Sequence, residues 1–410
     1  MAFRFANPSL AGHADSPERR LLLACAKTTH TEPSLQRIRD IVAEQLDWEI
    51  IAGLARRHRV RPLLLESLSK ASAESVPDPF MRPLREFAAA NARRSLFLTG
   101  ELFRILELFR SCTIPAAAFK GPILAADAYG NPALREAGDL DLLVRRRDIV
   151  KARQLLIEHG FLPGYPTATP REVEYLASLQ GRQQVQFLLA HSEHHLLREP
   201  GSVNVDLHWA LALRQFALRL NGRQLWTWLR PRAKGGREIL TFGPEHMLLV
   251  LCINGAKDCW HRLDRICDVA ELLAAHPELE WPIVLKLARQ IGAMRMLCTG
   301  LKLAETLLAS PLPPIAKQQI SMDKSLPAIA GQISDGLFGP PRGEVDEASI
   351  AKSWIHLKLR DGLGDRIAYA LAQFEPTIGD RAALPLPWAL QFLHYAIRPV
   401  RLGWRGLQYP

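Results

Sequence analysis

The sequence predicts an α+β protein in which a small mixed-sheet core is flanked by N- and C-terminal helical regions. Apolar residues recur at steps of three and four before residue 112 and after residue 211, which is typical of amphipathic helices. Between these regions lie short apolar or alternating segments bounded by Gly and Pro, which favour strands. We therefore expect a helical region at 1–90, the core at 91–210 and a second helical region at 211–410.

The N-terminal part is predicted to be helical through residues 17–112. Residues 47–68 carry apolar side chains at helical spacing, and Pro62 is expected to break or restart a helix there. Residues 91–112 form a second amphipathic helix, whose apolar stripe consists of Leu98, Leu102, Ile105, Leu106 and Phe109.

The core is predicted to run in the order helix, strand, helix, strand, helix and hairpin. Residues 114–119 are apolar and precede Lys120–Gly121, the pattern of a buried strand that ends in a turn. The expected elements after this turn are a helix at 123–130 ended by Gly130, a strand at 139–144, a helix at 148–159 ended by Gly160, and two antiparallel strands at 194–199 and 203–209 around a turn at 200–202.

The C-terminal region is predicted to return to helix. Residues 245–276 indicate two helical segments with a break near Asn254–Gly255. Residues 310–347 are rich in Pro, Gly and Ser, which favours a loose connection. The segment at 384–405 is apolar and basic, so it can be a helix packed on the core or a helix that makes weak contact with a membrane surface.

Length and composition favour a globular, cytoplasmic protein. The chain has 410 residues, of which 48% are hydrophobic, enough for two or three domains. No apolar stretch reaches the roughly 18–20 residues of a membrane-spanning helix, and the N-terminal segment has no apolar signal region. None of the six cysteines forms a CxxC pair, so we expect reduced structural thiols rather than zinc ligands.

The charge balance favours anionic partners. Lys and Arg number 52 against 42 Asp and Glu, which suits a nucleotide, a nucleic acid or a lipid surface. Neither a long basic tract nor an interleaved aromatic and basic platform is present in the sequence, so binding to a nucleic-acid polymer is disfavoured.

Two aspartates in the segment DLDLLV are the first candidate site. Because successive side chains of a strand alternate, Asp139 and Asp141 are expected to point to the same face. Adjacent carboxylates repel each other unless a cation lies between them, and hard oxygen ligands suit Mg²⁺. A pair of solvated aspartates near a strand end is the alternative.

Two further segments add to this pair. Lys120 and Gly121 lie where a strand is expected to meet a helix. A helix N-terminus that begins with a glycine is suited to bind a phosphate. An ordinary tight turn has the same sequence pattern and is the alternative. In the segment VNVDLH, Asp206 and His208 share one face, so Asp206 can supply a third carboxylate for a second metal or accept a proton from a hydroxyl. A strand-edge aspartate is the alternative.

The combination resembles a known family. The chain resembles the uncharacterised bacterial nucleotidyltransferases of the polymerase-β-like superfamily, and the similarity extends over nearly its whole length. The segments that carry the resemblance are FKGPILAADAYGNPALREAGDLDLLV, EHHLLREPGSVNVDLHWAL and NGAKDCWHRLDRICDVAELL. The resemblance implies transfer of a nucleoside monophosphate from an NTP, with ATP as the first expectation. It implies Mg²⁺ or Mn²⁺ as the cofactor. The implied acceptor is a hydroxyl of a small molecule, a sugar or polysaccharide precursor, a peptide or a protein.

The resemblance also assigns residues. It places Asp139, Asp141 and Asp206 as metal ligands and catalytic acids, and Lys120 and Gly121 as contacts of the nucleotide phosphates.

Other positions keep alternatives open. Arg135 can clamp a phosphate or pair with Glu136 or another acid, and His195 and His208 can line the pocket rather than bind zinc. Pro122 departs from the small residue usual in the superfamily and removes one N–H donor. A catalytically inactive nucleotide-binding or regulatory protein with the same fold is therefore the second hypothesis.

Overall fold

The computed structural model describes residues 16–71, 74–164, 170–178, 181, 192–199, 203–212, 216–234, 236–339 and 350–399. The chain divides into two compact units, each of which is assembled from separate segments. Unit 1 comprises residues 1–99, 120–137 and 243–359, and unit 2 comprises residues 100–119, 138–242 and 360–410.

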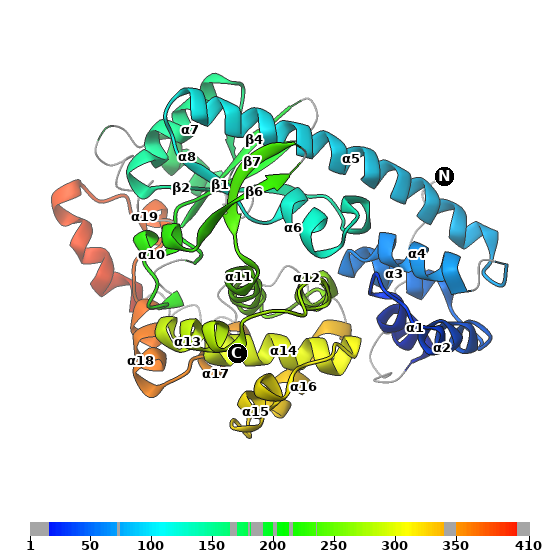
Figure 1. Cartoon of the computed structure of the whole chain (residues 1–410). Helices are drawn as coiled ribbons and strands as arrows, with labels where there is room; N and C mark the ends of the chain where they lie inside the picture. Colours follow the sequence, from blue (N-terminus) through cyan, green and yellow to red (C-terminus); the bar gives the residue numbers. More distant parts are fainter. Residues whose placement is uncertain are drawn as a thin grey trace. The chain divides into compact units, whose positions relative to one another are not determined.

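The first half of unit 1 is a group of packed helices. They are α1 (Pro17–Cys25), α2 (Glu32–Val42), α3 (Trp48–His58), α4 (Arg61–Ala71) and the first part of α5 (Asp78–Ser111) (Figure 1). The predicted break at Pro62 is confirmed, because α3 ends before Arg59, which has a φ of 55°, and Pro62 lies in the first turn of α4. Helix α5 begins earlier than predicted, since Pro83 near its start is tolerated.

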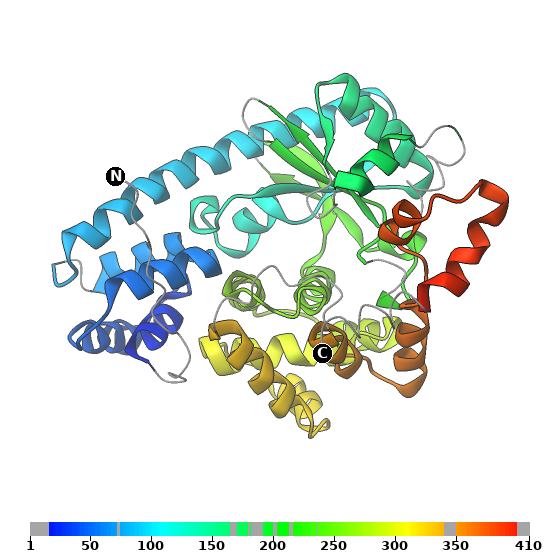
Figure 2. The same ribbon diagram turned by 180° about the vertical axis from the view of Figure 1, so that it is seen from behind.

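The rest of unit 1 is also helical. Helices α11, α12 and α14 pack on one another (Figures 1 and 2). The elements are α6 (Gly121–Ala128), η1 (Pro132–Leu134), α11 (Pro244–Lys257), α12 (Leu263–Ala275), α13 (Trp281–Ile291), α14 (Met294–Leu308), α15 (Pro314–Ser321), α16 (Leu326–Phe338) and α17 (Ile350–Lys358).

The two helical segments predicted at 245–276 are confirmed as α11 and α12, whereas the position of the break between them and the loose connection at 310–347 were predicted wrongly. Helix α11 continues through Gly255, and the break follows at residues 258–262. Gly255 is needed for packing, because a Cβ there would lie 2.4 Å from Cζ3 of the Trp260 ring. Much of the predicted loose connection at 310–347 is helix α15 and helix α16, whose prolines stand in their first turns, where proline is compatible with helix. Residues 340–347 lie outside the described ranges.

Unit 2 contains a five-stranded mixed sheet with the strand order β1-β2-β5-β4-β3. Strands β2 and β5 are parallel, and the other neighbours are antiparallel. The strands are β1 (Ala116–Ala118), β2 (Asp139–Val144), β3 (Leu162–Gly164), β4 (Glu193–Arg198) and β5 (Val203–His208). The predicted strands and the antiparallel pairing of β4 with β5 are confirmed, although the turn predicted at 200–202 lies outside the described residues. The predicted α+β class with a small mixed sheet is also confirmed.

The two faces of this sheet differ in polarity. Leu140, Val205 and Leu196 form one row across three strands, and all three are at most 1% exposed. The opposite face carries acidic and histidine side chains of the same strands. The polarity of the two faces follows from the sequence, because successive side chains of a strand point to opposite faces and the polar residues stand at every second position.

Unit 2 also contains a two-stranded antiparallel sheet that the sequence analysis missed. It consists of β6 (Leu229–Lys234) and β7 (Arg237–Phe242). The remaining elements are η2 (Arg146–Asp148), α7 (Ile149–Glu158), α8 (Pro170–Ser178), α10 (Gly222–Thr227), α18 (Leu363–Ala372), α19 (Ile378–Ala383) and η4 (Trp388–Leu393). Among the described residues, no helix has the length and apolar character required to span a membrane.

Candidate functional site

The polar face of the five-stranded sheet gathers charged side chains in two neighbouring rows. In one row, Asp141 of β2 pairs with Asp206 of β5, which pairs with His195 of β4. In the next row, His208 of β5 pairs with Glu193 of β4. The parallel pairing of β2 with β5 therefore brings together acids that are 65 residues apart in sequence, since 206 − 141 = 65.

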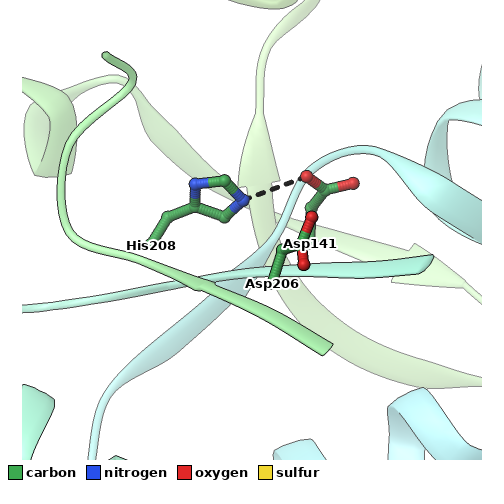
Figure 3. A group of neighbouring side chains, drawn as sticks. All are labelled: Asp141, Asp206 and His208. Atoms are coloured by element: carbon green, nitrogen blue, oxygen red, sulfur yellow. Dashed lines mark hydrogen bonds and ion pairs between the residues drawn. The ribbon is translucent and has the colours of Figure 1, made fainter. Parts of the chain in front are cut away.

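Asp141, Asp206 and His208 form a group with the chemistry of a metal site (Figure 3). One ligand atom from each residue lies within 4.8 Å of the others. Asp141 and His208 are only 4% and 3% exposed, so their polar atoms are held in a desolvated environment. Two carboxylates and an imidazole fit a divalent cation.

His208 lies between two carboxylates. Its Nε2 is hydrogen-bonded to Oδ1 of Asp141 at 3.0 Å, and its Nδ1 forms an ion pair with Oε2 of Glu193 at 2.9 Å. Burial disfavours the charged ring, but the negative charge of Glu193 and the hydrogen bonds with Asp141 and Glu193 outweigh it and raise the pKa of His208 to about 9. In the absence of a cation, the positive ring thus compensates the charge of the acids.

His195 forms a second carboxylate–histidine pair. Its Nδ1 is 2.6 Å from Oδ1 of Asp206, and 40% of its side chain is exposed. The hydrogen bond to Asp206 raises the pKa of His195 although partial burial opposes this. Asp206 is therefore oriented from the side of β4.

Phe119 forms an apolar wall beside the group. Its ring packs edge-on against the His208 ring at a centroid distance of 5.1 Å and against Phe242 of β7 at 5.5 Å. Its backbone N–H donates to the carbonyl oxygen of Asp141 at 3.4 Å. Because Phe119 is 1% exposed, it excludes water from one side of His208.

Asp139 lies on the same face of β2 as Asp141, as predicted, but opposite Asn204 rather than opposite an acid. It is not a member of the group whose ligand atoms lie within 4.8 Å among the described residues.

Lys120 and Gly121 belong to unit 1 and lie at the start of α6, the predicted strand-to-helix junction. Gly121 has a φ of 51°, a left-handed conformation that favours glycine over other residues. Pro122 occupies the first turn of the helix, where its missing N–H breaks no helical hydrogen bond.

Arg135 also belongs to unit 1 and shows the ion pair that was one of its two predicted alternatives. Its Nε and Nη2 donate to the two carboxylate oxygens of Asp268 at 2.8 and 3.0 Å. The Tyr129 hydroxyl donates to the same carboxylate at 2.8 Å. Burial would raise the pKa of Asp268, but the charge and hydrogen bonds of Arg135 lower it.

Glu193 was missed by the sequence analysis. The signal was present, because Glu193 lies two residues before His195 on an alternating strand, and His208 lies two residues after Asp206 on the next strand. The register that makes Glu193 face His208 was not available from the sequence.

One of three comparisons with known proteins gives a match. A family model described as uncharacterised nucleotidyltransferase matches residues 44–309, which include all five residues of the two rows. The comparison with curated proteins and the comparison with solved structures give no match.

Proposed function

We propose that the chain, which belongs to the family of uncharacterised nucleotidyltransferases, is an enzyme. Its proposed reaction is the transfer of a nucleoside monophosphate from an NTP to a hydroxyl acceptor. The observation that carries this proposal is the group formed by Asp141, Asp206 and His208 on the paired strands β2 and β5. In this reaction a bond forms between the acceptor oxygen and the α-phosphorus as the bond to the pyrophosphate leaving group breaks, and the acceptor hydroxyl passes its proton to the Asp206 carboxylate.

The residues of the two rows have distinct roles in this proposal. Asp141, Asp206 and His208 would hold a divalent cation, and Asp139 is proposed as a further acid on the same face. When bound, such a cation stabilises the negative charge on the reacting phosphate oxygens. His195 fixes the orientation of Asp206 through its hydrogen bond, and the Phe119 ring excludes water beside His208.

The finer assignments are also proposals. Lys120 and Gly121 are proposed as phosphate contacts on the strength of the resemblance, whereas the Arg135 guanidinium is already held by the Asp268 carboxylate. ATP is the proposed nucleotide, Mg²⁺ or Mn²⁺ the proposed cofactor, and the cytoplasm the proposed compartment. The acceptor class is a hydroxyl compound, because the chemistry of the site requires only an oxygen nucleophile.

A nucleotide-binding protein without catalysis is the second candidate function. Pro122 favours it, because the first turn of α6 has lost one backbone donor for phosphate. This alternative predicts metal-dependent nucleotide binding without transfer of label.

The test is transfer of α-phosphate-labelled ATP, GTP, CTP and UTP into acceptors of a host cell extract, with Mg²⁺ or Mn²⁺. The Asp141→Asn/Asp206→Asn double variant should lose transfer, because the cation loses two charged ligands. Glu158→Gln, which changes an exposed acid of α7, is the matched control and should keep wild-type transfer. Binding of labelled nucleotide by the wild type without transfer to any acceptor would favour the non-catalytic alternative.

A further inference from the structure

His208 is held between Asp141 and Glu193 in a way that indicates a defined role toward the cation. We propose that His208 is itself a metal ligand through Nε2, that Glu193 is its positioning residue, and that the site consequently favours first-row transition ions over Mg²⁺, with Mn²⁺ as the paramagnetic probe of the site. This inference rests on the proposed function, because it concerns the cation of the same site.

The distance between Nε2 of His208 and Oδ1 of Asp141 permits direct ligation of one ion by both atoms. Two ligand atoms bound to one ion at right angles, each at about 2.1 Å, are about 3 Å apart. The observed separation is 3.0 Å. Both atoms come from side chains that are almost fully buried, and a cation that binds between them must displace the Nε2 proton that makes the present hydrogen bond.

Glu193 contacts the opposite nitrogen of the same ring. Its Oε2 lies 2.9 Å from Nδ1 of His208, and the two residues are direct partners in the β4–β5 register. Histidines that bind metals commonly place their second nitrogen against a carboxylate, which fixes the ring and makes the ligating nitrogen a better donor. Asp206 is supported in the same manner by His195, so both sides of the cluster are held from β4.

The mixed donor set has a consequence for the choice of ion. Mg²⁺ favours oxygen ligands in strict octahedral geometry, whereas imidazole nitrogen favours first-row transition ions. A site made only of aspartates would suit Mg²⁺ well. Replacing one oxygen by the Nε2 atom of His208 shifts the preference away from Mg²⁺.

The experiment measures metal binding to the purified full chain without nucleotide. Pulsed EPR of bound Mn²⁺ should show coupling to a ¹⁴N nucleus, because one ligand is an imidazole. Calorimetric titrations with MnCl₂ and MgCl₂ should show tighter binding of Mn²⁺. His208→Asp should abolish the nitrogen coupling and lower the ratio of Mn²⁺ to Mg²⁺ affinity, since the site then contains oxygen ligands alone.

Variants of Glu193 test the positioning role. Glu193→Ala should weaken Mn²⁺ binding by about 10–100-fold, the usual effect of removing such a supporting group. Glu193→Gln keeps an oxygen at the same place and should recover part of this loss with the nitrogen coupling intact. His159→Asn is the matched control, because His159 is an exposed histidine at the end of α7, and it should leave binding unchanged.

The outcomes separate this inference from the proposed function. A wild-type Mn²⁺ spectrum without nitrogen coupling, or coupling that persists in His208→Asp, would overturn the inference even if nucleotidyl transfer proceeds with Mg²⁺. Nitrogen-coupled Mn²⁺ in a protein that transfers no nucleotide would support the inference and contradict the proposed function. If His208→Asp does not fold, His195→Asn decides the question, because nitrogen coupling that persists in this variant belongs to His208 and coupling that disappears belongs to His195.

Discussion

At the scale of single residues, Gly255 illustrates how a missing side chain determines packing in unit 1. It lies in the last turns of α11 against the fully buried Trp260 ring. Gly300 of α14 lies against the same ring, since a Cβ there would be 2.8 Å from Cη2 of Trp260. Trp260 is thus held between two glycines, and its own backbone has a φ of 52°.

The change Gly255→Ala is expected to destabilise the protein by about 1–3 kcal/mol, the usual cost of forcing an extra carbon into a packed core. Gly331→Ala is the matched control, because Gly331 lies inside α16 and a Cβ there meets no atom within 4 Å. That control should stabilise α16 by about 0.5–1 kcal/mol. Thermal unfolding followed by circular dichroism measures both, and equal effects of the two changes would contradict the packing argument.

The residues of the site were predictable where local alternation sufficed. Asp139 and Asp141 share a face because their spacing is two, and Asp206 and His208 do so for the same reason. The contact of His208 with Glu193 and that of His195 with Asp206 depend on pairing between strands. Turn geometry and packing set that register, and a single sequence does not display them.

At the scale of elements, the five-stranded sheet separates an apolar from a polar face. We expect Val205→Ala to destabilise β5 by about 2 kcal/mol, because two buried methyl groups are lost and a cavity remains. Asn204→Ala is the matched control on the exposed side of the same strand and should change stability by less than about 0.5 kcal/mol.

Hydrogen exchange of peptides that cover β4 and β5 would measure both substitutions locally. Faster exchange in Val205→Ala than in Asn204→Ala is the expected result. Similar exchange in the two variants would mean that the face with Leu140 and Leu196 does not carry the stability of the sheet.

Elements with clear periodicity were predicted, and elements that depend on tertiary packing were not. Strand β2 and helix α7 follow local patterns closely. Strand β6 was missed because LRPRAK contains a proline and three basic residues, which disfavour a strand. Its pairing with the more apolar β7 overrides that local preference.

At the scale of the whole molecule, the last segment of the chain completes unit 2. Arg360 is fully buried, and its guanidinium lies over the rings of Phe216 and Tyr369 at 4.0 and 5.0 Å. The Arg171 side chain of α8 donates to the carbonyl oxygen of Ala383 at 3.0 Å. Residues 360–399 therefore cover surfaces that belong to residues 138–242.

Truncation after Leu359 is expected to loosen unit 2 selectively, because those contacts are lost. Trypsin should cleave within residues 138–242 several-fold faster than in the full chain, as measured by mass spectrometry of the peptides over time. Residues 243–359 of unit 1 serve as the internal control and should be cleaved at the same rate in both chains. Equal protection of residues 138–242 in both chains would contradict this role of the last segment.

The order of strands in the sheet has an evolutionary consequence. Because β2 and β5 are adjacent and parallel, the chain must cross over between them, and strands β3 and β4 of the same sheet are formed within this crossover. Residues 165–192 connect β3 to β4, and these two strands are held together by backbone pairing. A connection between two paired strands can be lengthened, shortened or exchanged while Asp141 and Asp206 stay opposite each other in the β2–β5 register. Changes in this connection therefore leave the pairing of Asp141 with Asp206 intact.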